Sequence, residues 1–155
     1  GGCLMKIIAH RGNLCGPEEN TENDPIQIDR CLSRKLDVEI DLWFGNGFWL
    51  GHDSGNYKVD FNWILERKNS LWIHCKNIEA LCHLRVNAPE LNFFWHQSDD
   101  YTLTSQGWLW CYPGRPVVAS KPHKCDLPAI SVMPENISFD TANFIGICTD
   151  YPERY

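Results

Sequence analysis

The sequence predicts an α/β fold of the (β/α)8 barrel type, reduced in size, with short or missing helices in its C-terminal half. Short apolar segments alternate with helical patterns through the first half of the chain, which is typical of parallel β-α units. Eight segments in all have the character of strands. With 155 residues and a hydrophobic content of 43%, the chain can form one domain, residues 1–155, around a core.

Apolar runs predict four strands in the first half of the chain. The run at residues 5–9 is β-branched at its centre and is closed by a polar turn, which indicates a fully buried strand. The other three strands are predicted over residues 37–44, 71–75 and 92–96. A turn at residues 45–47 leads from the second strand into a short extension at residues 48–53.

Helix signals lie between these strands. Asp24-Pro25 predicts a helix start, because Asp accepts the free amides of a first turn and Pro suits the first helical position. An apolar stripe follows at helical spacing: Ile28, Cys31, Leu32 and Leu36. A short helix is predicted over residues 60–68, and another runs from Asn77 and ends before Pro89.

The second half of the chain has a different rhythm. Four more strands are predicted over residues 108–111, 117–119, 129–133 and 144–148, and the connections between them contain prolines and are mostly too short for full helices. A (β/α)8 barrel typically needs about 250 residues, so the predicted barrel must be a trimmed one. An open doubly wound sheet is the competing fold, but it would normally bring a glycine-rich phosphate loop after the first strand, and none is present.

Charge and hydropathy exclude several classes of protein. The net charge of −6 gives no basic footprint, which argues against nucleic acid as a partner. No apolar run approaches the roughly 20 residues that span a bilayer, and the N-terminus lacks the pattern of a signal peptide. Residues 1–4 precede Met5, which we interpret as the natural start. These features predict a cytoplasmic protein without a transmembrane segment.

The sequence contains eight cysteines. None forms a C-x-x-C pair, so a zinc knuckle is not expected. Several lie inside apolar segments, where a free cysteine behaves as a small hydrophobic residue. Their even number permits disulfides, but without a secretion signal we expect reduced thiols.

Polar residues that could take part in catalysis or binding follow or interrupt the predicted strands. His10 and Arg11 follow the first strand, and the arginine can grip a phosphate with two hydrogen bonds. Glu39 and Asp41 share one face of the second strand, because side chains alternate along a strand. Two carboxylates on a buried strand need a partner, and hard divalent cations favour such oxygen ligands. A solvated strand face is the alternative interpretation.

Further candidates come from later strands. His52 ends the extension of the second strand, and histidine is a residue type suited to proton transfer near neutral pH. His74 and Lys76 share one face of the third strand, and a lysine there can offset charge on a reacting phosphoryl group, although a surface role is the alternative. His96 ends the fourth strand, and on a barrel that tip faces the site.

The order of these motifs resembles the glycerophosphodiester phosphodiesterase family, which belongs to the barrel superfamily of phosphatidylinositol-specific phospholipase C. The resemblance is strongest from residue 6 to 53, weaker to 77, and weak from there to 143. The motifs that carry it are, in order, His10-Arg11-Gly12, Glu39-x-Asp41, His52-Asp53, a strand ending in x-Lys76, and Thr149-Asp150-Tyr151-Pro152.

The resemblance implies a metal-assisted cleavage of a small phosphodiester at the mouth of a barrel. His10 and His52 would form the acid/base pair, and Arg11 would bind the phosphate. Lys76 would stabilise the transition state. Glu39 and Asp41 would hold a divalent cation, Mg²⁺ or Ca²⁺, with His74 and His96 as further candidate ligands. In many relatives a substrate hydroxyl attacks its own phosphorus and gives a cyclic phosphate.

The sequence departs from the family pattern in three places. His74 stands where the family usually has a glutamate ligand, and imidazole suits transition metals better than Mg²⁺ or Ca²⁺. The Pro-Glu-Asn-Thr motif of the family is disturbed: residues 19–21 match its letters, whereas residues 22–25 fit the helix start and the spacing to Glu39, and we prefer the second register. The chain is also far shorter than a usual member, so substrate-covering loops must be missing.

Two rival functions remain open at the level of sequence. One is a binding protein that holds a phosphate ester in the same pocket without turnover, which His74 and the short length favour. The other is an enzyme that processes a sugar phosphate or a polymer through an open mouth.

Overall fold

The computed structural model describes residues 5–117, 127–137 and 140–155. The described part contains ten strands, which form one sheet. Their bounds are β1 (Lys6–His10), β2 (Asp37–Phe44), β3 (Phe48–Leu50), β4 (Tyr57–Val59), β5 (Leu71–Cys75), β6 (Phe93–Phe94), β7 (Tyr101–Leu103), β8 (Leu109–Cys111), β9 (Ala129–Val132) and β10 (Gly146–Thr149).

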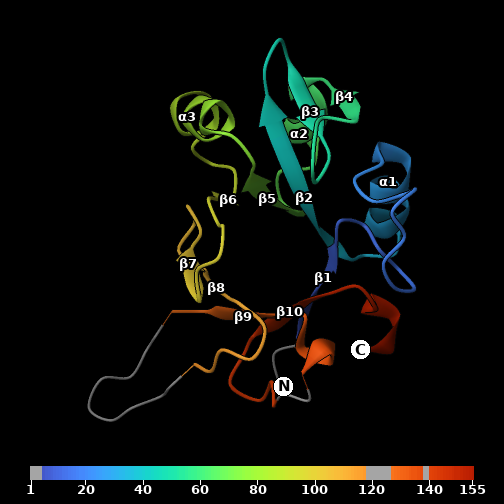
Figure 1. Ribbon diagram of the computed structural model, residues 1–155, viewed down its shortest axis with the longest axis vertical. Coiled ribbons are helices and arrows are strands. Elements are labelled where there is room, and N and C mark those ends of the chain that lie inside the picture. Colours follow the sequence, from blue (N-terminus) through green and yellow to red (C-terminus); the bar gives the residue numbers. More distant parts are fainter. Residues whose placement is uncertain (1–4, 118–126, 138–139) are drawn as a thin grey trace.

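Seven of these strands run parallel to one another, in the order β6-β5-β2-β1-β10-β9-β8. The short strands β3, β4 and β7 are antiparallel additions: β3 pairs with β2, β4 with β3, and β7 with β8. Figure 1 shows the parallel strands arranged around a ring, with their connections on the outside. The carboxyl ends of the parallel strands therefore come together at one mouth of this ring.

The ring is joined between β6 and β7 by a few hydrogen bonds and not by a strand ladder. Ser105, just after β7, donates its backbone N–H to the Phe93 carbonyl at 2.8 Å, and the Phe93 N–H returns a bond to the Ser105 hydroxyl at 2.9 Å. Among the described residues β6 pairs only with β5. The structure is thus a mixed α/β fold with a curved ten-stranded sheet, and a closed barrel ladder is not formed.

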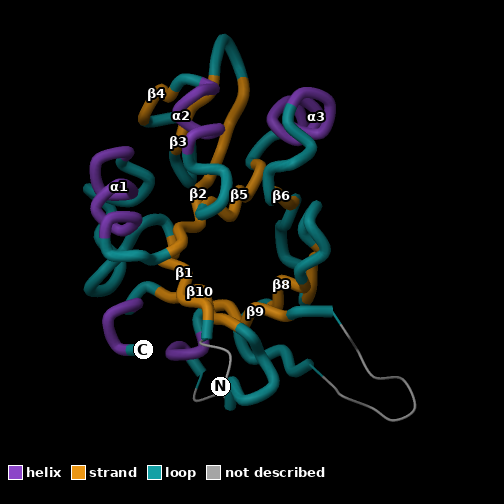
Figure 2. Tube along the Cα trace, turned by 180° about the vertical axis from the view of Figure 1, so that it is seen from behind, coloured by secondary structure: helices purple, strands orange, loops and turns teal. Residues whose placement is uncertain are grey.

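Three α-helices cover one part of the ring (Figure 2): α1 (Pro25–Ser33), α2 (Phe61–Glu66) and α3 (Ile78–Asn87). The predicted start of α1 is confirmed, because the Asp24 carboxylate accepts the Ile26 N–H at 2.9 Å. In the same way Asn77 caps α3 by accepting the Ala80 N–H. The part of the chain described after α3 carries only the short 3-10 turns η1 (Pro134–Asn136) and η2 (Pro152–Arg154), as expected for shortened connections.

The strand predictions need several corrections. The strand predicted at residues 92–96 shrinks to β6, and the extension at residues 48–53 to β3. The strands β4 and β7 were not predicted, because three-residue strands at a sheet edge leave almost no periodicity to detect. Residues 118 and 119 of the strand predicted at 117–119 lie outside the described residues, as do residues 1–4.

Alternating side chains separate two cores. On β2, Val38, Ile40 and Leu42 point outward into a large apolar cluster shared with the helices. A smaller cluster fills the inside of the ring and consists of Ile8, Trp72, Phe94, Trp110, Ile130 and Cys148. In the described part of the chain, every helix is too short or too polar to cross a lipid bilayer.

Candidate active site at the carboxyl ends of the parallel strands

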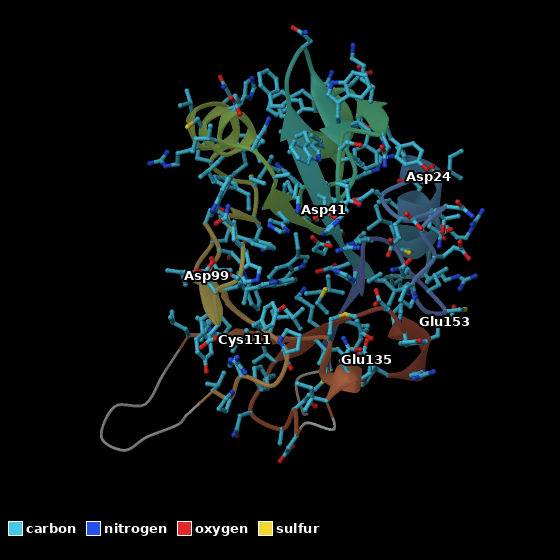
Figure 3. All side chains as sticks on the ribbon, in the orientation of Figure 1. Asp24, Asp41, Asp99, Cys111, Glu135 and Glu153 are labelled. Carbon is cyan, nitrogen blue, oxygen red and sulfur yellow. The ribbon has the colours of Figure 1, made fainter. Side chains whose placement is uncertain are left out.

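Polar side chains follow the inner apolar cluster at a spacing of two residues, which places them on the same strand faces, one layer nearer the mouth. The pairs are Ile8 and His10, Trp72 and His74, Phe94 and His96, Trp110 and Tyr112, and Cys148 and Asp150. The inner face of β2 contributes Glu39 and Asp41 in the same way. Figure 3 shows Asp41 on the side of β2 that faces the middle of the ring. The apolar cluster is therefore the floor of a polar layer.

A cavity of about 480 Å³ opens above this floor. All eight residues that the sequence predicts as site residues line it: His10, Arg11, Glu39, Asp41, His52, His74, Lys76 and His96. They come from five separate segments of the chain, and the topology of the sheet brings them to one place. Their roles stay predictions, but their proximity is a property of the fold.

The centre of the site is a buried group of two carboxylates and one imidazole. Glu39 is 3% exposed and Asp41 is 1% exposed. The Nδ1 atom of His74 lies 3.3 Å from Asp41 Oδ1 and 3.9 Å from Glu39 Oε2. One ligand atom from each of these residues lies within 4.8 Å of the others, so the three residues can hold a metal ion.

A backbone contact orients the His74 ring. Its Nε2 atom lies 2.8 Å from the carbonyl oxygen of His96. Because a carbonyl only accepts hydrogen bonds, Nε2 must carry the hydrogen. Nδ1 is then the atom that faces Glu39 and Asp41, and in the neutral ring its lone pair is available to a cation.

Burial and nearby charges shift the pKa values of the two carboxyl groups in opposite directions. Burial, reinforced by the nearby Asp41 charge, raises the pKa of Glu39 to about 7. Burial would also raise the pKa of Asp41, but the contact with the His74 ring and the hydrogen bond from the Asn23 amide outweigh it and bring that pKa below its ordinary value. The pair therefore favours one negative charge unless a cation joins it.

His10 is held by an aspartate from the far end of the chain. Its Nδ1 atom lies 2.8 Å from Asp150 Oδ1, and its Nε2 atom lies 4.0 Å from Glu39 Oε1. Burial opposes a charged ring, but the bond to Asp150 and the charge of Glu39 outweigh it, so the pKa of His10 is raised. Asp150 fixes one ring nitrogen and leaves Nε2 directed toward the carboxylates.

Arg11 reaches the carboxylates through both backbone and side chain. Its backbone N–H donates to Glu39 Oε1 at 3.2 Å, and its Nε atom lies 3.5 Å from Asp41 Oδ2. The residue has a φ of 55°, a left-handed conformation that is uncommon for arginine. Its Nε is buried without a hydrogen bond among the described residues. The strained backbone and the unused donor are both features typical of a binding site.

The loop before α1 supplies a support that the residue types alone do not reveal. The Asn23 amide donates to Asp41 Oδ2 at 3.0 Å, and its oxygen accepts the Asp41 N–H at 2.9 Å. Glu22 lies 3.6 Å from Arg11 Nη1. Asn13 donates to both Glu22 and Asp150. The register of residues 22–25 is thus the one that the structure brings against the site.

The remaining predicted residues lie around the rim. The side chain of His52 is 42% exposed and contacts Asp53 at 2.8 Å. Lys76 follows β5, and its backbone N–H donates to the Leu42 carbonyl. Burial, with the charge of His74 next, lowers the pKa of His96. His96 also lends its backbone carbonyl to His74, so its contact with the metal-ligand candidates runs through the main chain.

Asp150, Glu22 and Asn13 were missing from the predicted site residues. Asp150 had a usable signal, because it belongs to the Thr149-Asp150-Tyr151-Pro152 motif and follows a predicted strand. Glu22 and Asn13 lie in a loop rich in polar residues, where no spacing rule separates a site residue from a solvated one.

Comparison with known proteins supports the fold. No protein-family model and no curated protein matches the chain. A crystal structure described as a "putative glycerophosphodiester phosphodiesterase" from Galdieria sulphuraria is similar, with a TM-score of 0.58 and 14% sequence identity. The match covers 97% of this chain and 95% of the other. At this identity the similarity concerns the fold of the two chains.

Proposed function

We propose that this protein is a metal-dependent phosphodiesterase on a trimmed barrel scaffold, acting on a small phosphodiester. The observation that carries the proposal is the convergence of Glu39, Asp41 and His74 with His10 and Arg11 in one cavity. The similar fold of the Galdieria protein, described as a glycerophosphodiester phosphodiesterase, supports the same reaction class. A cytoplasmic location and a lack of nucleic-acid partners remain part of this proposal.

The residues present fit a divalent cation. Glu39 and Asp41 are buried side by side, and burial together with the charge of Asp41 raises the pKa of Glu39. The third donor is the imidazole of His74, which favours Zn²⁺ over Mg²⁺ and Ca²⁺. When bound, a divalent cation supplies electrostatic stabilisation to the phosphoryl oxygens.

The side chains of this protein divide the remaining chemistry among them. Asp150 holds Nδ1 of His10 and stabilises the charged ring, so Nε2 of His10 is suited to accept a proton from the attacking hydroxyl. His52, at the exposed rim, is placed to return a proton to the leaving oxygen. Arg11 and Lys76 provide positive charge where the phosphate gains negative charge.

A turnover assay tests the proposal. Glycerophosphodiesters are offered with Mg²⁺, Ca²⁺, Mn²⁺ and Zn²⁺ in turn, and product release is followed by chromatography. We expect turnover with at least one metal, its loss on chelation, and a decrease of about 10²–10⁴-fold in the His10→Ala and His52→Ala variants. Activity that is indifferent to both histidines would contradict the mechanism. Tight binding of a phosphate ester without turnover under any metal would instead favour the binding-protein alternative.

A further inference from the structure

The cavity has two unlike walls. The wall formed by β1, β2 and β5 carries the charged and imidazole groups described above. The wall at the ends of β6 and β8 includes Trp95 and Tyr112 beside His96. Trp95 is 36% exposed and Tyr112 is 44% exposed, although both are large side chains that line a cavity. Exposed aromatic rings inside a concave site are a frequent sign of ligand contact.

Both aromatic residues are anchored by the hairpin that β7 and β8 form. The Trp95 carbonyl accepts a hydrogen bond from the Thr102 hydroxyl at 2.9 Å, and the Tyr112 N–H donates to the Asp100 carbonyl at 2.9 Å. The Tyr112 ring also packs against the His96 ring, with a centroid distance of 5.6 Å. The aromatic wall is therefore built into the fold, because its backbone is held on each side.

Polar side chains line the cavity next to these aromatic residues. Gln97 and Asn136 line the same cavity, and so does the hydroxyl-bearing Tyr112. Within residues 5–117, 127–137 and 140–155, no hydrogen bond engages their side-chain polar groups. The wall thus offers flat apolar faces together with unengaged donors and acceptors.

A polyhydroxylated ring fits this combination of flat faces and polar groups. A hexose presents C–H groups that pack on an aromatic face and hydroxyls that need hydrogen-bond partners at the ring edge. An acyl chain would leave Gln97 and Asn136 facing apolar groups without compensation. A short alcohol such as ethanolamine has no flat face to cover Trp95 or Tyr112.

We infer that the wall containing Trp95 and Tyr112 is a subsite for a polyhydroxylated ring, so that the substrate is a sugar phosphodiester. The inference rests on the proposed function, since the phosphate is assigned to the wall of His10, Arg11 and Lys76. Trp95 and Tyr112 then act as specificity determinants, and Gln97 and Asn136 bind the ring hydroxyls.

Two esters of the same glycerol phosphate test this inference: glycerophosphoglucose, which carries a sugar ring, and glycerophosphoethanolamine, which does not. We expect kcat/KM to be about tenfold higher for the glucose ester, which corresponds to one good aromatic contact. Trp95→Ala and Tyr112→Ala should each remove about tenfold from kcat/KM for the glucose ester, and less than about twofold for the ethanolamine ester. Trp49→Ala is the matched control, because Trp49 is a partly exposed tryptophan on β3 that does not line this cavity.

The outcomes separate this inference from the proposed function. Equal use of both esters, or equal losses on both esters in the Trp95 and Tyr112 variants, would overturn the sugar subsite while leaving the phosphodiesterase intact. Absence of turnover on both esters would contradict the proposed function. In that case calorimetry with glucose 1-phosphate and glycerol 3-phosphate decides: tighter binding of the sugar phosphate that is lost in Trp95→Ala supports the subsite, and equal affinities overturn it.

Discussion

The two halves of the ring are built differently. Around β1, β2 and β5, helices and strands enclose an apolar cluster of eighteen buried residues. Around β8, β9 and β10, the outer cluster formed by the described residues contains three buried ones, namely Cys111, Ala129 and Phe144. Glu39, Asp41 and His74 all lie in the first half, whereas Trp95 and Tyr112 follow β6 and β8. We conclude that the groups needing the most exact placement lie on the more deeply supported strands.

One residue of the less covered half is needed for the exact placement of a group in the other half, and its substitution should have the largest effect on activity. Asp150 lies in the thinly covered half, yet it orients His10 in the other. Asp150→Asn should lower kcat by about 10²–10⁴-fold, because an amide can hold the wrong ring tautomer. The measurement is steady-state turnover with the preferred metal. Asp140→Asn, the same change in an exposed loop, should leave turnover unaffected, and equal losses in both variants would contradict the assigned role.

Stability measurements compare the two halves directly. Ile40→Ala in the large outer cluster should reduce the free energy of unfolding by about 2–5 kcal/mol, because it empties a fully buried site. Leu109→Ala, at a partly buried position against the small cluster, should cost about 1–2 kcal/mol. Urea denaturation followed by tryptophan fluorescence gives both values. Equal losses would show that the thin half is as tightly packed as the covered one.

Metal preference tests the chemistry of the covered half. His74→Glu replaces the imidazole by a carboxylate, so binding of Mg²⁺ or Ca²⁺ should tighten relative to Zn²⁺ by about 10–100-fold. Isothermal titration with each metal measures the change in the absence of substrate. Val86→Glu, at an exposed position on α3, serves as a control for an added negative charge. An unchanged metal order would remove His74 from the ligand set.

The acidity of Glu39 predicts a smaller, graded effect. Burial raises its pKa to about 7, so below that pH a cation must displace a proton from the carboxyl. Metal affinity should therefore fall about tenfold per pH unit below pH 7 and become nearly constant above it. Titrations between pH 5.5 and 8.5 measure the slope. A pH-independent affinity would place the cation away from Glu39.

The sequence could predict those features that depend on the alternation of side chains along a strand and on local capping residues. Glu39 and Asp41 follow from the period of two on a buried strand, and the helix start at Asp24 follows from its capping chemistry. Sequence could not predict the pairing of His10 with Asp150, because their separation of 140 positions is set by the topology of the sheet. It also missed the way β7 meets β6, which depends on single bonds made by Ser105 and leaves no period to detect.

The pairing of His10 with Asp150 has a consequence for how the site matures. Glu39, Asp41 and His74 are all synthesised well before Asp150. A nascent or truncated chain can thus gather its metal ligands before its proposed base is oriented. Catalytic competence would then arise only on completion of the ring, so that an unfinished chain is protected from premature chemistry.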